Sequence, residues 1–113
     1  KGPDMNKNLP TLPLPLLAVT ALATATPAKA SDAIVKKARC VACHTVDAKR
    51  VGPAYKDVAA KYRGDTTAPD KLFAKVRAGG SGVWGEVPMI PHGADKISDD
   101  DLKAAIKWIL ALE

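Results

Sequence analysis

The clearest pattern in the chain is a helical repeat of apolar positions near its end. Ser98 precedes three aspartates, which suit the first turn of a helix because their charges oppose the positive end of the helix dipole. Apolar residues then follow three or four positions apart, at Leu102, Ala105, Ile106, Ile109 and Leu112. This spacing predicts a helix that begins after Ser98 and buries one face.

Three shorter helices are predicted before it. They cover residues 32–38, residues 54–62 and the segment from Thr67 to Gly79. Ser31 can cap the first helix, and Thr67 with Asp70 resembles a capping box at the start of the third. No useful stretch alternates with a period of two, as a half-buried strand would. The pattern therefore predicts an all-α domain of about four helices.

Residues 79–95 follow neither pattern. This segment holds five glycines and has prolines at positions 88 and 91. A loop of this length in so small a domain is usually functional or disordered. Its apolar residues are too numerous for a solvated linker: Val83, Trp84, Val87, Met89 and Ile90. We expect the loop to pack against something large and flat.

Residues 1–30 differ in composition from the rest. A short basic start at residues 5–8 precedes an apolar stretch, and Ala-Lys-Ala at 28–30 gives a small-x-small step. This outline is typical of a secretory signal peptide, so we expect a periplasmic protein whose domain is residues 31–113. Prolines at 10, 13 and 15 leave too short an apolar run for a membrane-spanning helix, which needs about 20 residues. We therefore expect no membrane anchor after processing.

Composition limits what residues 31–113 can do. Removing residues 1–30 takes away three of the 17 basic and one of the 12 acidic residues and leaves a net charge of +3. So small a charge, without a basic run, argues against a nucleic-acid binder. The whole chain has only one Phe, two Tyr and two Trp, so a core of side chains alone would be marginal. We expect another group to fill it.

The pentapeptide at residues 40–44, Cys-Val-Ala-Cys-His, has the C-x-x-C-H spacing at which c-type haem is attached. The thiols of Cys40 and Cys43 can add across the two vinyl groups of a porphyrin to form thioethers, which directs His44 at the iron. The other ring nitrogen of this histidine needs a fixed acceptor, and a carbonyl in the turn at residues 51–53 is the candidate. The sequence therefore predicts one covalently bound haem c.

Two other cysteine chemistries fit less well. A thioredoxin-type pair requires a βαβ context that this pattern lacks. A structural zinc site has four candidate ligands: Cys40, Cys43, His44 and His92. However, the adjacent Cys43 and His44 are awkward ligands for a single tetrahedral ion, so the haem interpretation is favoured.

The second axial ligand of the iron has three possible identities. Met89 is the only methionine after residue 30, and flanking prolines at 88 and 91 limit the freedom of its backbone. A lone methionine is more often core filler than a ligand, but this one lies in the loop expected to cover a flat cofactor. The alternatives are His92, which would give a bis-histidine site, and an empty position suited to binding a gas.

Taken together, these residues resemble the small bacterial class I cytochromes c of the cytochrome c-551 type. The match runs through nearly all of residues 31–113. Its motifs are Cys-Val-Ala-Cys-His at 40–44, Val-Gly-Pro-Ala-Tyr-Lys-Asp-Val-Ala at 51–59, Gly-Val-Trp-Gly at 82–85, Pro-Met at 88–89 and Lys-Trp at 107–108. The resemblance implies a small single-domain class I cytochrome c fold wrapped around one haem.

The resemblance also implies roles for particular residues. His44 and Met89 become the axial ligands, and the carbonyl of Pro53 accepts a hydrogen bond from His44. Trp84 lies near a haem propionate. Lys75 stands where the family often has arginine, and it can still meet a propionate, although without a planar fork.

A haem with protein ligands on both faces has no open site for substrate, so we expect a one-electron carrier rather than an enzyme. Expected partners are redox proteins of respiration or denitrification, such as a periplasmic reductase, a terminal oxidase or a quinol-oxidising complex, and we expect a monomer. Basic residues flank the attachment motif and can form a positive rim: Lys36, Lys37, Lys49 and Arg50. The alternative function is a small haem sensor or weak peroxidase with an open or displaceable sixth ligand site.

Overall fold

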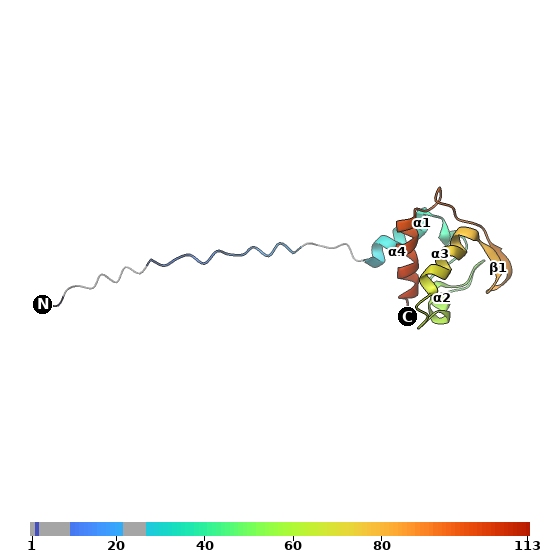
Figure 1. The fold of residues 1–113 in the computed structure, drawn as a ribbon, viewed down its shortest axis with the longest axis horizontal. Coiled ribbons are helices and arrows are strands. Elements are labelled where there is room, and N and C mark those ends of the chain that lie inside the picture. The colour runs from blue at the N-terminus through green and yellow to red at the C-terminus, as the bar shows by residue number, and fades with distance from the viewer. Residues whose placement is uncertain (1, 3–9, 22–26) are drawn as a thin grey trace.

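The computed structural model describes residue 2, residues 10–21 and residues 27–113. Along the chain it contains α1 (Pro27–Lys37), the short 3₁₀ helix η1 (Cys40–Ala42), α2 (Tyr55–Lys61), α3 (Ala68–Ala78), β1 (Gly80–Gly82), β2 (Gly85–Met89) and α4 (Asp99–Leu110). Figure 1 shows these elements gathered in one mostly helical domain, which confirms the predicted fold class. Within the described parts of the chain, no helix combines the length and the apolar character that crossing a membrane requires.

The structure describes only part of the predicted leader. Residues 10–21 form neither helix nor strand, and their large apolar side chains are exposed. The predicted basic start at residues 5–8 lies outside the described residues. The division of the chain at residue 30 therefore stays a prediction.

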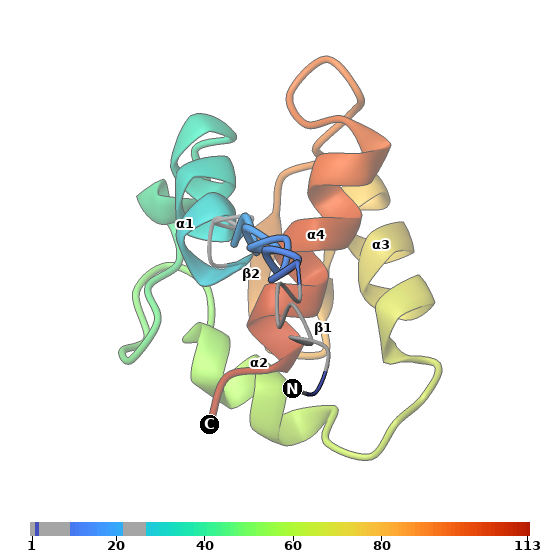
Figure 2. The same cartoon turned by 90° about the vertical axis from the view of Figure 1, so that its left-hand side faces the viewer.

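Helix α4 organises the domain. It packs against α1, α2 and α3, and Figure 2 shows it between α1 and α3. Its buried residues are Leu102, Ala105 and Ile106, three of the five apolar positions in the predicted repeat. Ile109 is half-buried, and Leu112 lies beyond the end of the helix. Leu102 and Ile106 join Ala38 and Ile97 in the buried core cluster. Burying a side chain of this size contributes about 1.5–3 kcal/mol, so this face fixes where α4 lies.

The helix starts agree only in part with the predictions. The hydroxyl of Ser98 accepts a hydrogen bond from the backbone N–H of Asp101 at 3.2 Å, so this cap is confirmed. Ser31 caps nothing, because α1 already begins at Pro27 and Ser31 is buried within the helix. Proline suits the first turn of a helix, since it lacks the N–H that would have no partner there.

The predicted capping box at Thr67 is also wrong. The hydroxyl of Thr67 donates to Asp65 at 2.6 Å and makes no cap hydrogen bond to α3. The same carboxylate accepts from the backbone N–H of Thr67 at 2.9 Å and from Lys71 at 3.0 Å. These bonds to Thr67 and Lys71 lower the pKa of Asp65 to about 2. The turn before α3 is thus built around Asp65.

Residues 79–95 contain a hairpin that the sequence pattern did not predict. Strand β1 pairs antiparallel with β2, with Gly80 opposite Met89 and Gly82 opposite Gly85. Gly82 and Gly85 have φ angles of 115° and 109°, which residues with a Cβ rarely adopt. All residues of β1 and most of β2 are exposed, so there is no buried face to produce an alternating pattern.

Candidate haem-attachment site

The two cysteines lie in a tight turn directly after α1. Arg39 has a left-handed backbone with φ 63°, which takes the chain out of α1 and into η1. The carbonyl of Cys40 then accepts hydrogen bonds from the N–H groups of Cys43 at 3.1 Å and His44 at 2.9 Å. The two cysteines form no disulfide with each other, and both are partly buried. The turn therefore gathers two thiols and an imidazole within five residues.

The ring of His44 is fixed by the turn at residues 51–53. Its Nδ1 lies 2.8 Å from the carbonyl oxygen of Pro53, which is the contact that the resemblance implied. Because a carbonyl only accepts, Nδ1 is the donor, and in the neutral ring this tautomer leaves the lone pair for a metal on Nε2. The N–H of Gly52 donates to the carbonyl of Cys43 at 2.8 Å and holds this turn against the attachment motif.

Gly52 gives the imidazole its space. A Cβ at this position would lie 2.8 Å from Nδ1 and 2.9 Å from Nε2 of His44, which is closer than real side-chain carbons approach. Any residue other than glycine must push the ring away from the Pro53 carbonyl. The glycine in the Val-Gly-Pro turn is therefore required by the position of His44 and not only by the turn.

Two aromatic rings, those of Tyr55 and Trp108, pack on one side of His44. The rings of His44 and Tyr55 stack with centroids 5.3 Å apart, and Tyr55 meets Trp108 edge-on at 5.8 Å. The hydroxyl of Tyr55 is buried and has no hydrogen-bond partner among the described residues. Burial raises the pKa of Tyr55 well above its ordinary value. The phenol therefore stays neutral and brings no charge to this side of the site.

Met89 is held at the end of β2 by the end of α3. Gly79 follows α3 with φ +68°, and a Cβ there would lie 2.5 Å from the carbonyl oxygen of Met89 and 2.8 Å from the nitrogen of Pro91. Only glycine permits so close a crossing of the two backbones. The sequence pattern predicts Gly79 only as the end of the third helix. No local pattern reveals that this glycine also lets the backbone at residues 89–91 approach.

The family resemblance implied that Trp84 and Lys75 lie near the haem propionates, and the structure places both residues at the hairpin. Trp84 occupies its turn, and the ammonium group of Lys61 lies 5.5 Å from the centre of the Trp84 ring. Lys75 projects from α3 toward the base of the hairpin, where its Nζ is 3.4 Å from the place a Cβ of Gly80 would occupy. Trp84 therefore lies in the hairpin, and Lys75 lies next to it.

His92, the alternative iron ligand, is buried, and its ring and backbone are both engaged in local contacts. Its Nδ1 lies 2.9 Å from the carbonyl oxygen of Ile90, and its N–H donates to the carbonyl of Val76 at 2.9 Å. Within the described residues, no three His, Cys, Asp or Glu side chains group in a way that could hold a metal ion. The four residues of the alternative zinc site are therefore not assembled.

The exposed apolar surface of the domain fits a flat apolar group. Within residues 31–113, the large apolar side chains that are exposed belong to the attachment motif, the turn at residues 51–53 or the hairpin and its exit: Val41, Val51, Val83, Trp84, Val87 and Ile90. A macrocycle attached at Cys40 and Cys43 would need apolar surface of this kind to cover it. Fold and site together define a small helical domain for the covalent attachment of haem.

Comparison with known proteins gives the same result. The sequence profile of the cytochrome c family matches residues 28–113. Cytochrome c-551 of Allochromatium vinosum is 52% identical over 96 residues, which are 85% of this chain and 100% of that protein. Cytochrome c-551 of Pseudomonas aeruginosa is 44% identical over 99 residues, or 87% of this chain and 92% of that protein. The crystal structure of Nitrosomonas europaea cytochrome c552 superimposes with a TM-score of 0.67 at 48% identity, covering 73% of this chain and 99% of that one.

The chain belongs to the cytochrome c family and, within it, to the small class I monohaem cytochromes. The predicted class I fold is confirmed. The predicted cofactor is confirmed as well: one haem c, held covalently through Cys40 and Cys43.

Proposed function

We propose that this protein is a periplasmic one-electron carrier, not an enzyme, with His44 and Met89 as the axial ligands of its haem. The observation that carries the proposal is the way each of these residues is held. Pro53 and Gly52 fix the ring of His44, and Gly79 fixes the backbone at Met89. An electron carrier needs axial ligands that stay in place in both oxidation states. His44 and Met89 meet this need because each is held by its own contacts.

The two ligands have different chemical roles. The haem, when bound, supplies a couple that takes up and releases single electrons. His44 presents a neutral nitrogen whose lone pair is oriented by the hydrogen bond to Pro53. Met89 presents a soft thioether sulfur, which favours the ferrous state and raises the reduction potential. The buried ring of Tyr55, which Trp108 meets edge-on, covers one face of the His44 ring.

The native protein tests this function against the alternative of a sensor or weak peroxidase. With His44 and Met89 both bound, we expect a ferric thioether-to-iron charge-transfer band in the far red, reversible one-electron reduction and no rapid binding of carbon monoxide to the reduced protein. Absorption spectroscopy, voltammetry and carbon monoxide titration measure these three properties. Immediate, stoichiometric carbon monoxide binding without a far-red band would favour the open-site alternative.

The docking face is proposed to be the surface around the attachment motif. Lys36 is already paired with Asp32 at 2.8 Å, whereas Lys49 and Arg50 are exposed on the loop that follows the motif. Redox partners such as a reductase, a terminal oxidase or a quinol-oxidising complex would meet this rim with an acidic surface, because opposite charges steer encounter. Interfaces of this kind are small and transient, which suits a carrier that must leave again.

Replacing Lys49 with glutamate is expected to slow association with an acidic redox partner on the order of three- to tenfold at low ionic strength, and to flatten its salt dependence. The reduction potential should hardly change, because an exposed charge is screened at the iron. Stopped-flow electron-transfer rates over a range of ionic strengths measure the effect. Lys103→Glu on α4 is the matched control, since it changes the net charge equally. Equal slowing in both variants would show that net charge acts and not the rim.

A further inference from the structure

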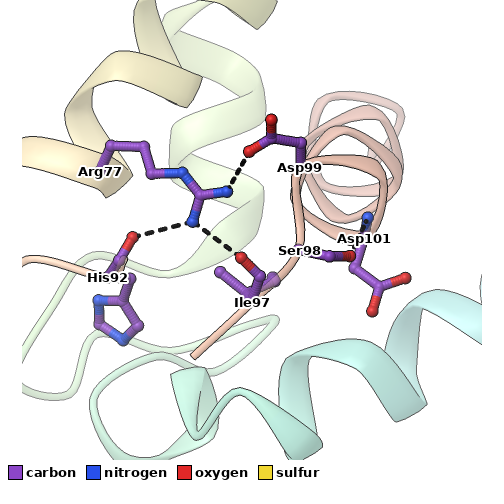
Figure 3. A network of polar contacts seen from close by, with 6 residues as sticks. All are labelled: Arg77, His92, Ile97, Ser98, Asp99 and Asp101. Atoms are coloured by element: carbon purple, nitrogen blue, oxygen red, sulfur yellow. Dashed lines mark hydrogen bonds and ion pairs between the residues drawn. The ribbon is translucent and has the colours of Figure 1, made fainter. Parts of the chain in front are cut away.

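Arg77 makes a three-way polar contact outside the attachment site. It lies in the last turn of α3 and its side chain is mostly buried, with 20% exposed. One terminal nitrogen donates to the carbonyl of His92 at 3.1 Å and to that of Ile97 at 2.8 Å, and the other pairs with Asp99 at 2.5 Å. Figure 3 shows the guanidinium group between these three partners.

These partners mark the two ends of one connection. Residues 92–97 join the segment after β2 to α4, and Asp99 is the first residue of α4. A single side chain therefore fastens both ends of the connection to α3. The planar fork of arginine suits three acceptors in different directions, which a lysine ammonium on a flexible stem does not match as well.

Hydrogen bonds and close backbone contacts link residues 92–97 to the segment that holds Met89. The N–H of His92 donates to the carbonyl of Val76 on α3, and the ring of His92 bonds to the carbonyl of Ile90. Gly79 closes against the backbone from Met89 to Pro91. For residues 89–92 to move away from α3, the hydrogen bond from Arg77 to the carbonyl of His92 must therefore break as well.

We infer that Arg77 is a positioning residue that keeps Met89 in place and so controls how readily an external ligand displaces it. The inference rests on the proposed ligation by Met89. Displacement requires an open state in which the segment around Met89 has moved, and the apparent affinity of the external ligand scales with the population of that state. The contacts of Arg77 stabilise the closed state, and none of them touches His44.

Imidazole binding to the ferric holoprotein tests this role. Arg77→Gln keeps polarity and similar length but loses the charge and the fork, and we expect imidazole to bind about tenfold more tightly, a change of about 1.4 kcal/mol. Arg77→Lys should increase the imidazole affinity less than Arg77→Gln does. Asp99→Asn should increase it least, because Arg77 keeps both of its carbonyl contacts in that variant. Lys71→Gln is the matched control, because it removes a charged contact at the opposite end of α3.

Three measurements separate positioning from general stability: the imidazole titration, the loss of the far-red band, and unfolding in denaturant followed by circular dichroism. Unchanged imidazole affinity in Arg77→Gln would overturn the inference, and so would an equal gain in Lys71→Gln or loss of the band only together with global unfolding. If Arg77→Gln does not fold, Arg77→Lys and Asp99→Asn give the same comparison. A native protein without the far-red band would instead refute the ligation by Met89.

Discussion

Met89→Ala is expected to leave the haem attached, abolish the far-red charge-transfer band and lower the reduction potential by on the order of 0.1 V or more, within the ~0.8 V range over which axial ligands act. The sulfur at this position favours the ferrous state, so its loss shifts the couple toward the ferric state. The variant should also bind carbon monoxide and imidazole readily. Absorption spectroscopy and voltammetry on the purified protein measure these changes.

His92→Ala is the control for this experiment. The ring of His92 is bonded to the carbonyl of Ile90 and is not an iron ligand in this proposal, so its removal should leave the band in place. If His92→Ala abolishes the native ligation while Met89→Ala does not, the iron has two histidine ligands. Loss of the haem from either variant into acidified organic solvent would contradict covalent attachment.

The second large effect concerns folding. A double variant, Cys40→Ala with Cys43→Ala, purified without haem, is expected to be largely unfolded. Among the described residues, the buried apolar core consists mostly of small and medium side chains, five of them alanine, and Tyr55 is its one aromatic ring. The apolar residues around the attachment motif remain exposed unless the haem covers them. A group that binds only the folded chain stabilises it, so its removal shifts the equilibrium toward the unfolded state.

Far-UV circular dichroism during heating measures this effect. The native holoprotein is the control: it should show a cooperative transition, keep its colour after denaturation and resist thiol-labelling reagents at Cys40 and Cys43. A cooperative transition at native helicity in the double variant would show that the side-chain core is sufficient.

The parts of the fold that the sequence predicted well are those encoded locally. Helix α4 combines a cap at Ser98, three aspartates in its first turn and a continuous apolar face, all within one stretch of the chain. The attachment motif is likewise complete in five residues, and its acceptor Pro53 lies nine positions beyond His44. Such features need no knowledge of the rest of the fold.

The features that were missed depend on distant contacts or on the absence of a pattern. The hairpin of β1 and β2 is rich in glycine and exposed, so it carries no alternation that could predict strands. Arg77 joins residues 15 and 20 positions away, and nothing near it in the sequence points to those partners. The second role of Gly79 was missed for the same reason, because the backbone atoms close to it belong to residues 89–91, beyond the hairpin.

The two sides of the site also differ in the length of chain that must be ordered. The bond from His44 to Pro53 closes a loop of nine positions, whereas Met89 follows His44 by 45 positions. For a flexible chain, the longer closure costs about 1.4 kcal/mol more in entropy. The histidine side can therefore form early, with only residues 40–55 in place, while docking of Met89 waits for α3, the hairpin and α4. The spacing of the two proposed ligands therefore favours a folding order in which the turn around His44 forms before Met89 docks.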